Sequence, residues 1–147
     1  MKAFSFRLDQ VFRWREMQVT LQESRLAAAA ARLTEIRASI DSGNRELTAA
    51  AASIAAAQTG ADLAAYADFR QRTRARIRDL ESQAQTAQRT VALETSRLVE
   101  ANQKLKLIAN LKEKAQAGWR HEFDRELSAF ADEAFLNRLR APARASR

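Results

Sequence analysis

The side chains in this sequence that could take part in chemistry are one histidine and a run of arginines. His121 stands beside Arg120, and the chain has no cysteine and no second histidine that could share a metal ion. Catalysis by a Ser/His/Asp set needs a pocket that holds the three groups together. The glycines Gly43, Gly60 and Gly118 are isolated, so they form no phosphate-binding loop. We therefore expect no catalytic residue, no metal site and no cofactor, and we interpret the protein as non-enzymatic.

The arginine run is the segment RQRTRARIRD, in which Arg70, Arg74 and Arg78 recur every four residues and share one helical face. Such arginines could contact nucleic acid phosphates, an acidic protein, or only solvent. Acidic residues return at Asp79 and Glu81, and no aromatic residue stands between the arginines to stack on bases. The formal net charge of +7 favours acidic partners without choosing among them. All three interpretations remain open at this point.

The composition predicts helices as the elements that position these side chains. Proline occurs once and glycine three times, while alanine, leucine, arginine, glutamate and glutamine dominate. Charged residues at the N-terminus, such as Arg7 and Asp9, are incompatible with the apolar core of a signal peptide. The alanine clusters are far shorter than the ~20 apolar residues that span a bilayer. We expect an all-α, cytoplasmic protein with no membrane insertion.

A seven-residue repeat of apolar side chains indicates a coiled coil, and we call the residues of one helix that face the other its seam. The first series is Phe12, Val19, Leu26, Leu33, Ile40, Leu47 and Ile54, with the companions Arg15, Gln22, Ala29, Ile36, Gly43, Ala50 and Ala57. The second series is Leu63, Arg70, Ile77, Ala84, Val91, Leu98, Leu105, Lys112 and Trp119, with the companions Tyr66, Thr73, Leu80, Ala87, Glu94, Ala101, Ile108 and Ala115.

The sequence QTGADL separates the two series. We expect Gly60 to end the first helix with a positive φ and Asp62 to be the N-cap of the second. The predicted fold is a long antiparallel two-helix coiled coil, an α-hairpin whose second helix is the longer, in one domain over about residues 1–140. Its predicted parts are helix 1 at about 5–58, a turn at 59–62, helix 2 at about 63–139, and a basic disordered tail at 141–147. A break at Gly43 would instead give three helices, but the repeat continues through it.

The unequal lengths of the helices leave large apolar side chains without cover. With the turn near Gly60, roughly twenty residues of helix 2 extend past helix 1, on the order of 30 Å. That extension carries the stripe Trp119, Phe123, Leu127, Phe130 and Ala134, flanked by Phe135 and Leu139. Either the first N-terminal residues fold over this stripe or another protein covers it.

Two further sets of apolar residues could contact a partner. Trp14, Met17 and Leu21 point away from the seam of helix 1 by their spacing. Tyr66 and Phe69, just after the turn, could form the edge of the core or a contact at the turn end of the hairpin.

Three stretches resemble the flagellar FliJ family, small proteins of the type III flagellar export apparatus. They are FSFRLDQVFRWRE from Phe4, YADFRQRTRARI from Tyr66, and KLKLIANLKEKAQAGWRHEFDRELSAFADEAFLNRLR from Lys104. The chain departs from the family where Trp119 replaces a frequent tyrosine and where ELSAFADEA is more apolar than the usual segment.

The resemblance implies an antiparallel coiled coil, similar in shape to the γ subunit of rotary ATPases, that escorts export chaperones and couples the hexameric export ATPase to the cytoplasmic domain of the export gate. It assigns Tyr66 and Phe69 to the contact with the gate. It also implies that the protein is peripherally associated with the export apparatus at the inner membrane. To the ATPase ring it assigns Trp14, Met17, Leu21, Trp119, Phe123, Leu127 and Phe130. A self-associating coiled-coil scaffold and a basic nucleic-acid-binding coiled coil are the alternatives.

Overall fold

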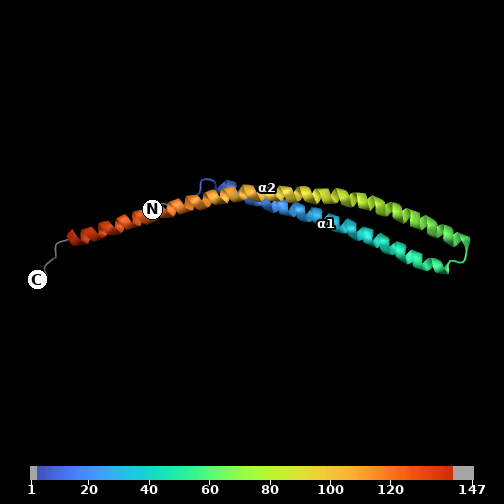
Figure 1. Cartoon of the computed structure of the whole chain (residues 1–147). Helices are drawn as coiled ribbons and strands as arrows, with labels where there is room; N and C mark the ends of the chain where they lie inside the picture. Colours follow the sequence, from blue (N-terminus) through green and yellow to red (C-terminus); the bar gives the residue numbers. More distant parts are fainter. Residues whose placement is uncertain (1–2, 141–147) are drawn as a thin grey trace. The chain divides into compact units, whose positions relative to one another are not determined.

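Two long helices make up most of the protein, as a computed structural model that describes residues 3–140 shows (Figure 1). Helix α1 spans Asp9–Ser53, the short 3-10 helix η1 spans Ile54–Ala56, and helix α2 spans Gly60–Arg140. The predicted all-α fold, with two helices packed against each other and the second one longer, is confirmed. The tail predicted for residues 141–147 lies outside the described residues.

Helix α1 begins at Asp9, four residues later than about residue 5, where we placed it. The backbone N–H of Asp9 donates to the carbonyl of Phe6 at 3.1 Å, and that of Phe12 donates to Leu8 at 2.9 Å. The Asp9 carboxylate in the first turn lies at the positive end of the helix dipole, which favours this start. The helix then continues without a break through Gly43.

A capping box in the turn starts α2, and it differs from the prediction. Thr59, not Asp62, is the residue before the helix: its hydroxyl accepts the N–H of Asp62 at 3.2 Å. The Asp62 carboxylate in return accepts the N–H groups of Thr59 at 3.0 Å and Gln58 at 3.2 Å. Gly60 has no positive φ and is the first residue of α2. The prediction was wrong because Thr59 and Asp62 cap the helix through reciprocal hydrogen bonds, whereas we assigned Asp62 alone as the N-cap.

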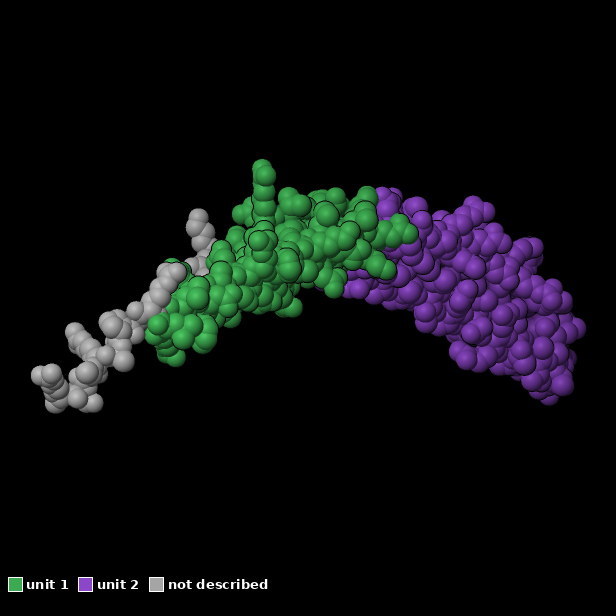
Figure 2. Space-filling view, turned by 60° about the vertical axis from the view of Figure 1, so that its left-hand side comes forward, with its two compact units in different colours: residues 1–17, 103–147 green, residues 18–102 purple. Residues whose placement is uncertain are grey.

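The described chain divides into two compact units, which are coloured separately in Figure 2. Unit 1 contains Met1–Met17 and Gln103–Arg147, and unit 2 contains Gln18–Asn102. Each unit includes a part of both helices, and each is described by itself below.

In unit 2 the helices run antiparallel, and the middle of their seam is the apolar core. Leu33, Ile36 and Ala87 are buried together. The partly buried residues that pack against them are Ile40, Leu80, Ala84 and Val91. All of these are seam positions of the two predicted series.

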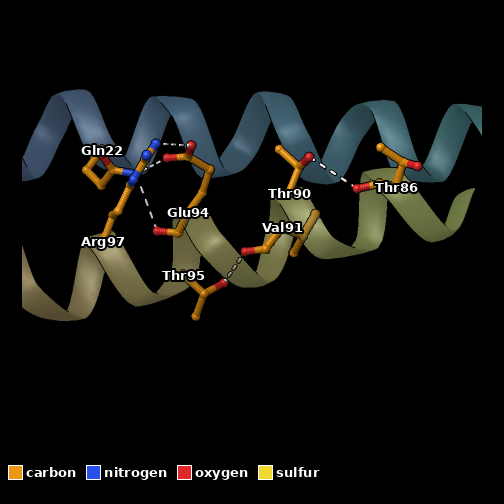
Figure 3. Close-up of polar contacts among 7 residues, drawn as sticks. All are labelled: Gln22, Thr86, Thr90, Val91, Glu94, Thr95 and Arg97. Atoms are coloured by element: carbon orange, nitrogen blue, oxygen red, sulfur yellow. Dashed lines mark hydrogen bonds and ion pairs between the residues drawn. The ribbon is translucent and has the colours of Figure 1, made fainter. Parts of the chain in front are cut away.

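Polar residues interrupt the apolar seam of unit 2 at Gln22 and Glu94, which are both buried (Figure 3). The amide of Gln22 donates to the carboxylate of Glu94 and to its backbone carbonyl, the latter at 3.3 Å. Arg97 donates to the same carboxylate at 2.9 Å. These bonds satisfy a carboxylate that would otherwise be costly to bury.

The predicted seam of α2 is wrong at three positions, because Leu63, Arg70 and Ala115 are exposed. The inward-facing residues instead step by four twice in succession, at Phe69, Thr73 and Ile77 and again at Ile108, Lys112 and Gln116. A straight helix has 3.6 residues per turn, so a strict seven-residue repeat drifts around it. An extra four-residue step restores the alignment, and a fixed period of seven cannot predict where it occurs.

Candidate docking surfaces

The N-terminal segment of unit 1 covers the first part of the aromatic stripe on α2. The rings of Phe4 and Trp119 have centroids 6.0 Å apart, and those of Trp119 and Phe123 are 5.2 Å apart. All three residues are half-buried. Of the two alternatives that the sequence left open, cover by the N-terminal residues applies to Trp119, whose ring is in contact with Phe4.

The stripe continues beyond this cover as an exposed apolar face. Gln116, Trp119 and Phe123 are half-buried seam residues, and the next positions at the same spacing are Leu127 and Phe130. Leu127 is 50% exposed and Phe130 is 69% exposed. Other large exposed apolar residues of this last part of α2 are Phe135, Leu136 and Leu139. This face of α2 is thus half-buried as far as Phe123 and exposed from Leu127 onward.

Charged side chains border the exposed part of the stripe. A shallow hollow of about 410 Å³ beside it is lined by Glu122, Arg125, Glu126 and Ala129. This border is mixed in charge, whereas its centre is apolar. Surfaces with an apolar centre and a polar rim are typical of protein–protein contacts.

An ion pair between Asp9 of α1 and Lys112 of α2 joins the two helices in unit 1. The Lys112 ammonium donates to the Asp9 carboxylate at 2.9 Å and lies 4.5 Å from the centre of the Phe12 ring. The hydrogen bond from Lys112 is the main cause that lowers the pKa of Asp9 below its ordinary value, and Arg13, at 3.0 Å, also contributes. Desolvation acts in the opposite direction without cancelling the shift.

The outward-facing triplet of α1 is exposed, as its spacing predicts. Trp14 and Met17 belong to unit 1, and the Arg15 guanidinium lies 4.6 Å from the centre of the Trp14 ring. Leu21 is also exposed but belongs to unit 2. Among the exposed leucines of unit 1 that were not singled out from the sequence are Leu107 and Leu111 on α2. Their spacing of four residues outside the repeat is the signal that could have indicated them.

The two aromatic residues after the turn are half-buried. Tyr66 occupies its predicted seam position, and Phe69 takes the inward position that the repeat assigned to Arg70. Each side chain is thus partly packed in the seam of unit 2 and partly accessible to a partner.

The arginines of unit 2 fall into two groups. Arg76 forms an ion pair with Glu46 of α1 at 2.9 Å, and Arg72 donates to the backbone carbonyl of Asp68 at 3.4 Å. Arg70, Arg74 and Arg78 are exposed and make no hydrogen bond or ion pair with any described residue.

Neither a metal site nor a membrane span is present in the described part of the chain. Within residues 3–140, no group of three or more His, Cys, Asp or Glu side chains could hold a metal ion, and His121 is exposed. No helix there is both long and apolar enough to cross a membrane.

Comparison with known proteins assigns a family to the chain. The family model described as "Flagellar FliJ protein" matches residues 4–144. No curated protein and no solved structure matches the chain.

Proposed function

Because the match covers nearly the whole sequence, this chain belongs to the flagellar FliJ family, and from that premise we propose that it couples the hexameric export ATPase to the export gate. The family is a structural component of the flagellar export apparatus and is not known for catalysis. In this proposal the protein acts by contact alone. It works in the cytoplasm, at the periphery of the inner-membrane export apparatus, and it also escorts export chaperones.

One observation carries the ATPase contact: the apolar face of α2, which is half-buried at Trp119 and Phe123, is exposed at Leu127 and Phe130. Large apolar side chains that gather on one surface mark sites of protein contact. The same face includes the partly covered Trp119 and Phe123, and Trp14 and Met17 supply further exposed apolar area in unit 1. We assign these residues to the contact with the ATPase ring. Leu21 is assigned to the same contact, but it belongs to unit 2, and the proposal does not depend on it.

The substitution Leu127→Ser with Phe130→Ser tests this contact. Both side chains are exposed, so helicity by circular dichroism should stay unchanged. Buried aromatic and aliphatic anchors of an interface commonly cost about 2 kcal/mol or more when truncated. We expect the complex with the flagellar export ATPase of the same organism to weaken at least about thirtyfold, measured by calorimetry or co-purification.

Leu107→Ser with Leu111→Ser is the matched control, because these leucines are also exposed on α2 in unit 1 but lie outside the stripe. The control should bind the ATPase as the unchanged protein does. Equal weakening in both variants, or full binding by the Leu127/Phe130 variant, would remove the assignment. Substitution of Trp119 is a less direct test, since its ring also contacts Phe4.

Tyr66 and Phe69 are proposed to contact the cytoplasmic domain of the export gate, at the end of unit 2 that holds the turn. Tyr66→Ala with Phe69→Ala should abolish capture of that domain and leave ATPase binding intact. Loss of helicity in this variant would instead show that the two rings are needed as core.

The exposed stripe also favours one alternative, a scaffold that self-associates through Leu127 and Phe130. The mass in solution, measured by sedimentation at increasing concentration, separates the two. A stable dimer that dissociates in the Leu127→Ser/Phe130→Ser variant, without any ATPase complex, would favour the scaffold.

A further inference from the structure

We propose that Arg70, Arg74 and Arg78 form a docking site for an acidic amphipathic helix of another protein. We call this set the arginine stripe. The arginine stripe shares no residue with the apolar stripe that contains Leu127 and Phe130, so this proposal does not depend on the proposed ATPase contact. It also differs from the proposed gate contact, since Phe69 faces inward in unit 2 whereas the arginine stripe is exposed.

The arginine stripe differs from its neighbours Arg72 and Arg76 in its lack of hydrogen bonds and ion pairs to the described residues. Arg76 has Glu46, and Arg72 has a backbone carbonyl, whereas the three stripe arginines have no bonded partner among residues 3–140. Three adjacent charges without a partner repel each other, and a set of carboxylates would relieve that repulsion.

The spacing of the stripe indicates the shape of its partner. Residues four apart on a helix rise about 6 Å and form a ridge, so the stripe extends over about 12 Å. A partner helix whose carboxylates also recur every four residues presents the same rise, and two such ridges pack side by side. The planar guanidinium group of arginine binds carboxylates through two parallel hydrogen bonds, which lysine cannot do. Leu63 is exposed one heptad before Arg70 and gives the partner an apolar contact on the same face.

Phosphate polymers and membranes fit the stripe less well. Three arginines over about 12 Å neutralise only a few phosphates, and the nearby rings of Tyr66 and Phe69 are half-buried rather than free to stack on bases. For a membrane surface, three charges contribute on the order of 3 kcal/mol, and Leu63 is the one large apolar residue exposed beside them.

A second copy of this chain is also an incomplete partner. The charged border of α2 offers Glu122 and Glu126, four residues apart, but the next position of that ridge is Phe130 and Arg125 stands between them. At a spacing of four residues, the protein itself therefore offers only two of the three carboxylates that the stripe would bind.

The test uses the full chain and a synthetic helical peptide of about 20 residues that carries glutamates at i, i+4 and i+8 on its polar side and leucines on its apolar side. Binding is measured by fluorescence anisotropy. We expect association at low salt that weakens as the ionic strength rises above ~0.15 M. Arg70→Gln with Arg74→Gln and Arg78→Gln should weaken it at least about tenfold, with helicity unchanged because the three side chains are exposed.

The control variant Arg25→Gln with Arg32→Gln and Arg89→Gln removes the same charge from other exposed positions of unit 2 and should weaken binding less than twofold. The control peptide has the same composition with its glutamates at irregular spacing, and it should bind weakly. Equal weakening by both variants, equal binding of both peptides, or no binding would overturn the proposal. Stripe-dependent binding that is tighter to single-stranded DNA, to anionic vesicles or to a second copy of the chain would also overturn it.

Discussion

Gly43 of α1 lies directly against Ile77 of α2 in the seam of unit 2. A Cβ atom at position 43 would be 3.0 Å from Cγ1 and 3.2 Å from Cδ1 of Ile77, which is tighter than ordinary van der Waals contact. Glycine in a helix interior costs roughly 1 kcal/mol relative to alanine. The close approach of the Ile77 side chain to the backbone of α1 is therefore the physical reason for a glycine at this position.

The first prediction contrasts Gly43 with Gly118, which lies inside α2 with open space around it. Gly118→Ala should raise the free energy of unfolding by up to about 1 kcal/mol, because it gains helix propensity without a clash. Gly43→Leu should lower it by about 1–3 kcal/mol, since the added atoms overfill the seam at Ile77. Urea denaturation monitored by circular dichroism measures both. A stabilising Gly43→Leu would show that the helices separate there at little cost.

The second prediction concerns the buried pair Gln22 and Glu94 (Figure 3). Gln22→Ala should lower the free energy of unfolding by about 1–3 kcal/mol, because the Glu94 carboxylate loses a partner in a buried position. Gln22→Leu with Glu94→Leu should be close to neutral, since it removes both polar groups together.

The same double variant tests whether the pair fixes the alignment of the helices. A polar pair inside an apolar seam specifies register, and without it other alignments and dimers become accessible. We expect sedimentation to detect a concentration-dependent dimer in the double-leucine variant. A strictly monomeric double variant would show that the remaining seam is sufficient.

The third prediction is a pH dependence at Asp9, whose pKa is lowered from 3.8 chiefly by the hydrogen bond from Lys112. In the unfolded chain the carboxyl group has its ordinary pKa, so it binds a proton there before it does in the folded protein. Its contribution to stability is thus fully present above the unfolded pKa and is lost as the pH falls through the lower folded value.

Asp9→Asn should remove this contribution. The unchanged protein should therefore have a higher free energy of unfolding than the variant at neutral pH, and this difference should shrink as the pH falls from about 5 to about 2. The control is Asp68→Asn, an exposed residue whose carboxylate makes no bond with any residue from 3 to 140. If the difference in unfolding free energy between the unchanged protein and Asp9→Asn does not depend on pH, the Asp9 side chain contributes to stability through something other than its charge.

The fourth prediction follows from the contact of Phe4 with Trp119. In a Trp14→Phe background, Trp119 is the only tryptophan, and its fluorescence reports on its cover. Phe4→Ala should shift the emission to the red and increase quenching by acrylamide. The lost ring contact should cost about 0.5–1.5 kcal/mol in addition to the lost burial. Phe135→Ala, which changes a ring that is already exposed, should leave the emission unchanged.

The seven-residue repeat was enough to predict the fold class, the hairpin and most of its seam. Every position of the first series, from Phe12 to Ile54, is buried or half-buried, and its companion Gly43 is buried as well. The prediction succeeds because a repeat of apolar residues determines which side of a helix avoids water, whatever partner covers that side. The excess length of the second helix likewise follows from the position of the turn alone.

The tertiary structure decided the features that depend on which residues meet across the two helices. Arg70 and Phe69 are neighbours, and only the packing against α1 determines that the phenylalanine faces inward and the arginine outward. Phe4 reaches Trp119 because residues 3–8 are not helical, which the repeat does not report. Periodicity describes one helix at a time, whereas register and cover are properties of contacts between segments far apart in the chain.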